Sequence, residues 1–446
     1  MLKFQSDFSS KYKRMVVPFK AKLVEPIYLL PMDEREAALK EAGYNVVNLL
    51  SHQTYLDFLS DSGTGALSSL QVASMITASQ AYFNTPSFFK LQRTVKDILG
   101  FPYVIPVHQG RGGQHVFDYV LLQKGSIVAG NTPFVVVSIA IEMQGGKFVD
   151  CIATHSVSNV FNGNIDLPKL ENVINENASK LSYIMITVQC SGKPISMENI
   201  RNVSSLAKKS KVMLCCDAAR FTENAYYIKK YEEGYNQKKI TEIVSEMFSY
   251  FDACLMSGKK DAIVPAGGFI ALKDEKLADK IKVPLIAFEG YDTYGGMTSA
   301  GMDAMAQGLI ESTQDEYCAH RVEQIHRFAA LLQENNIPII EPPFSHFIKI
   351  DAHRFFPNVP IAEYPSYLLA AELYMEGGIR CTPHRDESKG IEICLISIPR
   401  RTYSFEHFEY VADVCKTVFQ RKGNIRNGFK LVSEKSDLFS CKFVYA

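Results

Sequence analysis

The sequence lacks the features of a membrane protein and of a nucleic-acid-binding protein. Its longest mostly apolar run, residues 134–141, is far too short to span a bilayer, and no apolar secretion segment follows the first methionine. Lys plus Arg and Asp plus Glu balance at 48 each without a long run of one sign, so nothing draws the chain to nucleic acid or to an anionic membrane. We therefore expect a soluble cytoplasmic protein.

The cysteines lack the spacing of a metal site. All ten are scattered, none forms a CxxC motif, and the closest pair is the adjacent Cys215 and Cys216 in an apolar segment. A zinc site or a disulfide framework is therefore not predicted. With 446 residues, of which 47% are hydrophobic, the chain can bury a substantial core and is expected to form two or three domains.

Short apolar segments alternate with helical patterns through the middle of the chain. The predicted strands are rich in β-branched and sulfur-containing residues and lie at 183–188, 212–216, 253–256 and 268–272. Helical patterns cover 197–210 and 223–250. This alternation predicts a mostly parallel sheet covered on both faces, with functional side chains at the carboxyl ends of its strands.

The pattern changes after about Thr313. Apolar residues recur at helical spacing from Val322 to Leu332, which predicts an amphipathic helix that links two domains. Strand patterns at 347–352 and 392–399 and a helical pattern at 405–419 follow. We predict an N-terminal arm with part of the small domain in residues 1–55, a large domain in 56–312, and a small α+β domain in 313–446.

A pair of lysines, Lys259 and Lys260, follows an apolar segment and precedes a glycine pair. Apolar flanks and a neighbouring like charge both disfavour the ammonium form, which makes an amine available as a nucleophile. A lysine that forms a Schiff base needs this preparation. On this segment alone, a solvated lysine pair at a strand end is an equally good interpretation.

Two other segments carry compatible chemistry. Asp217 ends a strand pattern and Arg220 follows one turn on. A buried carboxylate needs a cationic partner, which either a protonated pyridine nitrogen or Arg220 would supply, and in isolation the ion pair is the better interpretation. The glycine-rich turn at 107–113 opens a helical segment whose amides suit a phosphate, although such turns are common.

Taken in sequence order, these segments closely resemble the β-eliminating lyases, the pyridoxal-phosphate (PLP) enzymes typified by tyrosine phenol-lyase and tryptophan indole-lyase. The segments that carry the resemblance are Gln109–Gly112, Asp217–Arg220, Glu223–Tyr226, Glu246–Tyr250, Ser257–Asp261, Tyr294–Gly296 and Ile398–Arg401. The resemblance implies a PLP-dependent transferase fold of type I, the aspartate-aminotransferase type. It also implies a homotetramer, built as a dimer of dimers, whose subunits share active sites.

The resemblance implies four catalytic residues. Lys260 would bind PLP as a Schiff base and move the substrate's α-proton, and Asp217 would pair with the pyridinium nitrogen. Arg220 would contact the cofactor's phenolic oxygen, and Tyr82 would act as general acid toward the leaving group. Further implied contacts to the cofactor are Gln109, Gly110 and Ser257 at the phosphate, Lys259 beside it, Arg111 near the site, Phe134 stacked on the ring and Gln189 near the phenolic oxygen.

The sequence departs from the family where the substrate's α-carboxylate is bound. Counted back from the Pro-Arg-Arg motif, the family's carboxylate-binding arginine corresponds to Leu395. A guanidinium–carboxylate pair contributes strongly where water is excluded, and leucine supplies none of it. Either the substrate is not an ordinary α-amino acid, or another cation takes this role, the candidates being Arg385, Arg400, Arg111 and His384.

The side-chain pocket also departs from both typical enzymes. Val135 stands where the phenol-lyase has threonine and the indole-lyase aspartate, and His384 stands where the phenol-lyase has arginine. Leu438 replaces phenylalanine or histidine, and Ser60 replaces threonine. We therefore expect a substrate other than tyrosine or tryptophan, although simple apolar packing explains Val135 and Leu438 equally well.

The family's potassium site is altered as well. Its glutamate corresponds to Gln80, whose neutral amide attracts a cation less, so a requirement for K⁺ is doubtful. Gly63 and Pro265 could still offer backbone carbonyls to a monovalent ion.

Three functions remain open from the sequence. The favoured one is a PLP-dependent lyase that catalyses β-elimination, by cleaving a C–C or C–heteroatom bond, on a small-molecule substrate that is an amino acid or resembles one. The second keeps PLP but changes the reaction to β-replacement, decarboxylation, retro-aldol cleavage or transamination, which the leucine at 395 favours. The third is a non-catalytic PLP-binding protein, which the surviving acid–base groups disfavour.

Overall fold

The computed structural model describes residues 17–154, 160–189, 192–341, 343, 346–425, 427–433 and 440–446. They form two compact units, here called the large unit (17–18 and 65–322) and the small unit (19–64 and 323–446). Both divisions fall later in the chain than the predicted boundaries at 55/56 and 312/313. The first is later because β1 (Leu56–Asp57) pairs with β10 (Ile379–Arg380) of the small unit, and the second lies inside the long helix α12 (Asp315–Glu334).

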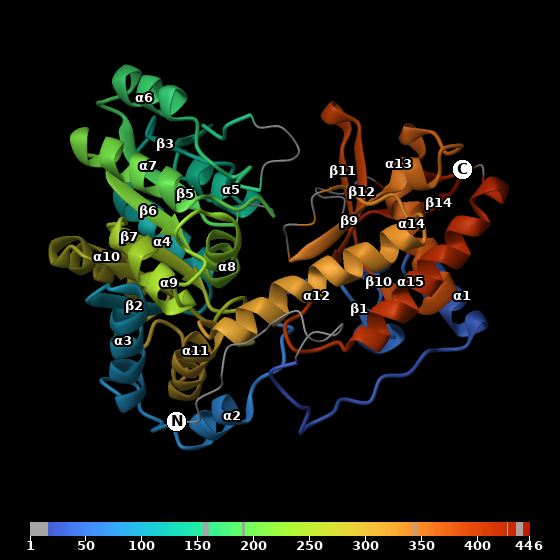
Figure 1. Cartoon of the computed structure of the whole chain (residues 1–446), viewed down its shortest axis with the longest axis horizontal. Coiled ribbons are helices and arrows are strands. Elements are labelled where there is room, and N and C mark those ends of the chain that lie inside the picture. Colours follow the sequence, from blue (N-terminus) through green and yellow to red (C-terminus); the bar gives the residue numbers. More distant parts are fainter. Residues whose placement is uncertain are drawn as a thin grey trace. The chain divides into compact units, whose positions relative to one another are not determined.

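A seven-stranded sheet forms the centre of the large unit (Figure 1), with the strand order β2-β8-β7-β6-β5-β3-β4. Neighbours run parallel except at β8, which is antiparallel to both β2 and β7. The mostly parallel sheet is therefore confirmed, and β5 to β8 match the four predicted strands within two residues. The strands are β2 Tyr103–Val107, β3 Ile127–Gly130, β4 Lys147–Asp150, β5 Leu181–Thr187, β6 Met213–Asp217, β7 Ala253–Ser257 and β8 Gly268–Leu272.

Helices cover both faces of this sheet, which explains why its strands are apolar on both sides. Ile184, Leu214 and Cys254 point to one face, where they pack with α3 Pro86–Leu99, α6 Leu167–Glu176, α7 Met197–Lys209, α8 Phe221–Tyr231, α9 Ile240–Ser249 and α11 Ser299–Ser312. The alternate residues of the same strands pack with α4 Gly110–Leu121, α5 Val135–Met143 and α10 Glu275–Phe288. The large unit also contains α2, Ser69–Ile76.

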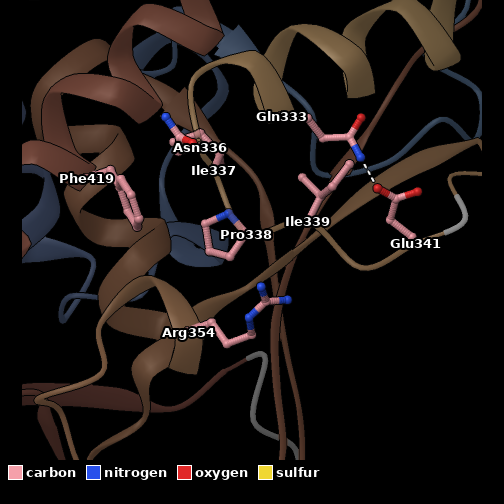
Figure 2. A pocket seen from close by; sticks show the side chains of 8 residues that line it. All are labelled: Gln333, Asn336, Ile337, Pro338, Ile339, Glu341, Arg354 and Phe419. Atoms are coloured by element: carbon pink, nitrogen blue, oxygen red, sulfur yellow. Dashed lines mark hydrogen bonds between the residues drawn. The ribbon is translucent and has the colours of Figure 1, made fainter.

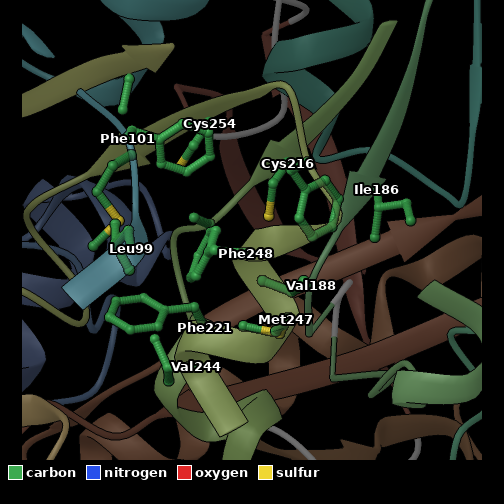
Figure 3. Close-up of a cluster of buried hydrophobic side chains, with 14 of the residues drawn as sticks. Leu99, Phe101, Ile186, Val188, Cys216, Phe221, Val244, Met247, Phe248 and Cys254 are labelled. Carbon is green, nitrogen blue, oxygen red and sulfur yellow. The ribbon is translucent and has the colours of Figure 1, made fainter. Parts of the chain in front are cut away.

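The predicted helical region 223–250 is two helices, α8 and α9. The segment between them contains Gly234, whose φ of 84° is a left-handed conformation that glycine adopts readily and that an α-helix does not contain. Both helices are anchored by aromatic packing (Figure 3), because the ring of Phe248 lies 5.5 Å from that of Phe221 and 6.0 Å from that of Phe101. This packing holds the start of α8, which follows Arg220, against the sheet.

The small unit is an α+β arrangement with the antiparallel strand order β11-β12-β9. The predicted strands at 347–352 and 392–399 correspond to β9 and β12, and the predicted helices at 322–332 and 405–419 lie in α12 and α15. The other elements are α1 Met32–Glu41, α13 Ala352–Phe355, α14 Pro365–Gly377, β11 Thr382–Asp386 and the β13–β14 hairpin (Phe429–Ser433, Lys442–Tyr445); the predicted ones are β9 Phe347–Asp351, β12 Ile391–Ser397 and α15 Phe405–Gln420.

In the described part of the chain, no helix combines the length and the apolar character needed to cross a bilayer.

A buried carboxyl group on α4 should make stability depend on pH. Asp118 is fully buried and accepts hydrogen bonds from Tyr183 (2.6 Å) and Gln114 (2.7 Å). Burial outweighs these bonds and raises the pKa of Asp118 to about 6. Because this value exceeds that of the unfolded chain, the contribution of Asp118 to stability is fully present below about pH 4 and is lost as the pH rises through 6.

We expect the unfolding free energy of the wild type, relative to Asp118→Asn, to fall by roughly 3 kcal/mol between pH 4 and pH 7. Urea unfolding of both proteins across this range measures the difference. Parallel stability curves would show that Asp118 does not titrate in this window.

Candidate active site

The candidate Schiff-base lysine follows β7, at the carboxyl end of the parallel strands. Lys260 donates a hydrogen bond to the hydroxyl of Ser257, with 3.0 Å between Nζ and Oγ. The segment after it turns sharply, since Ile263 has a φ of 51° and donates its N–H to the carbonyl of Lys260. The buried Gln71 donates its side-chain amide to the carbonyl of Ile263 at 3.0 Å. The lysine therefore stands on a loop whose path is fixed from both sides.

Asp261 ties this loop to the start of α8. It is fully buried, and its Oδ2 accepts hydrogen bonds from both the N–H and the hydroxyl of Thr222, each at 2.8 Å. Arg220 and Thr222 flank the first residue of α8, so Asp261 couples the lysine loop to the segment that carries Asp217 and Arg220.

Three polar side chains lie on one face of the sheet, at the carboxyl ends of adjacent strands. Thr187, Asp217 and Ser257 end β5, β6 and β7, and their side chains share the face that α4 covers, because alternate residues of a strand share a face. Thr187 pairs directly with Asp217. The buried hydroxyl of Thr187 has no hydrogen-bond partner among the described residues. The sequence reasoning missed this threonine, although a polar residue at the end of an apolar strand was the available signal.

Asp217 is an unfavourable place for a negative charge. Burial raises the pKa of Asp217, while the charge of Lys260, the N–H of Ala219 and the charge of Arg220 oppose this in decreasing order. These opposing influences only partly offset the effect of burial. A protonated ring nitrogen would stabilise the carboxylate directly.

The amino end of α4 lies against the end of β7. A Cβ atom at Gly110 would stand 2.8 Å from that of Ser257, so only glycine permits this approach. The side chain of Gln109, the residue before the helix, accepts a hydrogen bond from Nζ of Lys259 at 3.1 Å. Partial burial and then the charge of Arg111 lower the pKa of Lys259. Two crowded cations and a helix amino end together suit a phosphate.

The groups in the large unit fit pyridoxal phosphate. The start of α4 together with Lys259 would hold its phosphate, Asp217 would face its ring nitrogen, and the amine of Lys260 would bind its aldehyde carbon. The buried Thr187 hydroxyl adds a polar group on the same face of the sheet, beside Asp217.

Four other predicted residues of the large unit have clear surroundings. Phe134 and Val135 begin α5 and are 55% and 66% exposed, so burial in the core does not explain Val135. Gln189 is buried just after β5 with a φ of 60°. Tyr82 is 47% exposed, and its ring packs against that of Tyr294 with 4.5 Å between centroids and a tilt of 32°. The role of Tyr82 as general acid remains a prediction.

In the small unit, two of the cations suggested as carboxylate binders are already engaged. Arg400 is buried and donates to Asp61 at 2.8 Å. Arg385 pairs with the buried Glu392 at 3.2 Å and lies over the ring of Tyr364.

Four further residues of the small unit were predicted to line the substrate pocket, and the structure describes three of them. The Ser60 hydroxyl accepts a hydrogen bond from the N–H of Ser62. His384 and Leu395 lie on neighbouring strands, β11 and β12. Leu438 lies outside the described residues.

The predicted ion-site residues are divided between the units. Gln80 and Pro265 are exposed in the large unit, and Gly63 belongs to the small unit, with a φ of 80°. Among the described residues there is no group of three His, Cys, Asp or Glu side chains that could hold a metal ion. A potassium site built on backbone carbonyls remains a prediction.

A hollow of about 360 Å³ opens elsewhere in the small unit (Figure 2). None of the residues predicted from the sequence lines it, so it is not the site that the motifs indicate. Its lining residues are Gln333, Asn336, Ile337, Pro338, Ile339, Glu341, Arg354 and Phe419.

Solved structures with the same fold define the class of protein. A serine palmitoyltransferase from Sphingomonas wittichii has a TM-score of 0.63 and 13% identity, covering 88% of this chain and 97% of that chain. A threonine aldolase from Leishmania major has a TM-score of 0.60 and 16% identity, covering 82% and 99%. At such identities the likeness shows the fold alone, which is the PLP-dependent type I fold predicted from the sequence.

Sequence comparison narrows the class to one family. A model of the β-eliminating lyase family matches residues 57–413. Tyrosine phenol-lyases from Symbiobacterium thermophilum and Clostridium tetani are 39% and 40% identical, each covering 96% of this chain and 98% of its own length. A probable β-eliminating lyase from Trichomonas vaginalis is 40% identical over 94% of this chain and 97% of its own. The chain belongs to the β-eliminating lyase family. It is a PLP-dependent lyase, as the sequence predicted.

Replacing Asp261 should loosen the lysine loop. Asp261→Ala leaves two buried donors of Thr222 without their acceptor, so we expect a loss of about 2–4 kcal/mol in unfolding free energy, measured by urea unfolding. Thr222→Val, which keeps the backbone hydrogen bond, serves as control and should lose about 1 kcal/mol. Equal losses in both variants would contradict a role for the backbone contact.

Proposed function

We propose that the protein catalyses β-elimination on an α-amino acid with a leaving group at its β-carbon, and that neither L-tyrosine nor L-tryptophan is its best substrate. The observation that carries the substrate proposal is Val135, an exposed apolar residue next to Phe134. It stands where both typical enzymes are expected to place a polar side chain near the substrate. The names of the relatives favour L-tyrosine, which is therefore the reference compound for any test.

Pyridoxal phosphate, when bound, supplies an electron sink that stabilises negative charge at the carbon bearing the amino group. The residues of this chain supply the proton chemistry in the proposal. The Lys260 amine, held by Ser257, takes the proton from the α-carbon. Asp217 would face the ring nitrogen and keep it protonated. Burial raises the pKa of Asp217, so its carboxylate is stable as an anion only when a cation lies opposite. Tyr82 donates a proton to the leaving group as its bond to the β-carbon breaks. The aminoacrylate that is released then reacts with one water molecule to give pyruvate and ammonium.

The proposal includes assembly of the protein into a homotetramer. Tyr82, Phe83 and Tyr291 form an exposed aromatic cluster of the large unit, with the Phe83 and Tyr291 ring centroids 4.7 Å apart. Exposed aromatic clusters of this kind are typical of interaction surfaces. They support the proposed homotetramer, which light scattering of the purified protein would test.

A second candidate function keeps the cofactor and changes the reaction. Leu395 favours it, because a substrate held without the expected arginine can present a different bond to the cofactor ring. Decarboxylation, retro-aldol cleavage, transamination and β-replacement are the reactions in this class.

We expect holoprotein to release pyruvate and ammonium from S-methyl-L-cysteine with a kcat/KM at least about tenfold above that for L-tyrosine or L-tryptophan, a difference of about 1.4 kcal/mol. Coupled pyruvate and ammonium assays in potassium and in sodium buffers measure this and show whether K⁺ is required. Lys260→Ala should abolish turnover and the visible absorbance of the bound cofactor, whereas Lys276→Ala, at an exposed lysine of α10, should change neither.

Fastest turnover of L-tyrosine would contradict the substrate proposal. Carbon dioxide or an aldehyde without pyruvate would instead support the second candidate.

A further inference from the structure

The β-sheet of the small unit places a lysine beside Leu395. Leu395 in β12 pairs with Lys349 in β9 on one side and with Thr382 in β11 on the other. Directly paired residues in antiparallel strands project to the same face, with their Cβ atoms about 5 Å apart. Thr382, Leu395 and Lys349 therefore stand abreast on one face of the sheet.

This face is the one that the core of the small unit does not cover. Ile348, Ile350 and Ile396 are fully buried in that core on the opposite face. Leu395 and Lys349 are only partly buried. Nζ of Lys349 lies 5.4 Å from the centre of the Phe347 ring, which stands on the same face and is itself 8% exposed. The ammonium group is thus presented from an apolar surface, where a charge interaction is stronger than in open water.

His384 of β11 and Asp351 of β9 project to the same face as Lys349. Partial burial lowers the pKa of His384, the charges of Lys349 and Lys389 lower it further, and Asp386 opposes them. His384 therefore tends to be neutral at pH 7. Asp351, two pairs further along the β9–β12 ladder, uses its Oδ1 to accept the N–H of Arg354 and so begins α13.

We propose that Lys349 binds the α-carboxylate of the substrate, in place of the arginine that the family resemblance leads one to expect at position 395. The positive charge would thus stand on β9, directly opposite the position on β12 where the arginine is expected, and on the same face of the sheet. The inference rests on the proposed function, and it defines the substrate class as amino acids with a free α-carboxylate. Arg385 and Arg400 are held by carboxylates of the small unit, Glu392 at 3.2 Å and Asp61 at 2.8 Å.

A pair of small ligands isolates the carboxylate. L-Alanine has no β leaving group and cannot undergo elimination, and L-alaninamide is the same molecule with the carboxylate neutralised. Each is titrated into holoprotein, and the change in visible absorbance of the bound cofactor gives a Kd. The ratio of the two Kd values reports recognition of the carboxylate separately from turnover.

We expect Lys349→Met to weaken L-alanine by about tenfold or more and to leave L-alaninamide unchanged, because one charge-assisted hydrogen bond is lost. Lys349→Arg should keep most of the affinity. Lys430→Met, at an exposed lysine on β13 of the same unit, is the matched control and should bind both ligands like the wild type.

Moving the charge back across the sheet provides the sharpest test. The double variant Lys349→Met with Leu395→Arg should regain the affinity for L-alanine that Lys349→Met loses. Leu395→Arg alone should change the affinity for L-alanine by less than about threefold. Lys349 already binds the carboxylate in this variant, and the two adjacent cations repel one another.

The inference is overturned if Lys349→Met leaves the L-alanine Kd unchanged, or weakens both ligands equally, as a purely structural role would. Either result leaves the lyase proposal standing, provided that holoprotein still has its cofactor absorbance and still forms pyruvate. If wild-type protein supplied with pyridoxal phosphate gains no such absorbance, the proposed function fails as well. The three readouts thus separate the two failures.

Discussion

The site depends on a carboxylate, Asp217, that is held in a poor environment for its charge. Burial raises its pKa, and the opposing influences within the chain only partly offset this. A cation that faces it therefore stabilises the carboxylate, and within the chain the largest such influence is the charge of Lys260, which follows the neighbouring strand β7. The seven-stranded sheet supplies that arrangement, because it ends β5, β6 and β7 side by side and sends Thr187, Asp217 and Ser257 to one face.

Rigidity around this carboxylate comes from hydrogen bonds that reach across the chain. Asp261 joins the lysine loop to α8, and Gln71 joins the same loop to α2. Both side chains are fully buried, so leaving their partners unsatisfied would be costly and the loop has few alternative paths. The backbone of the loop that carries Lys260 is consequently held by buried polar contacts. A catalytic amine benefits from such a fixed base, since proton transfer requires hydrogen-bond distances.

Sequence patterns predicted the large unit well and the small unit less completely. The strands β5 to β8 are buried on both faces and read as continuous apolar runs, so their positions could be predicted within two residues. Asp217, Ser257 and Lys260 were recognisable because they follow such runs directly. The domain boundaries were missed because a two-residue strand, β1, carries little pattern and because α12 runs through the division between the units. The break between α8 and α9 depended on one glycine inside a helical composition.

The register of the small sheet was beyond what the sequence could supply, and it matters most for the substrate. Comparison along the chain finds Leu395 where an arginine is expected and stops there. Pairing in an antiparallel sheet relates residues that are far apart in sequence, and here it relates Leu395 to Lys349. What a carboxylate requires is a cation at a certain position, whichever strand carries it. Because directly paired residues lie close together, a cation on either of two paired strands can bind the same carboxylate. An apparent loss of a binding residue in one strand is therefore evidence about specificity only after its cross-strand partners have been identified.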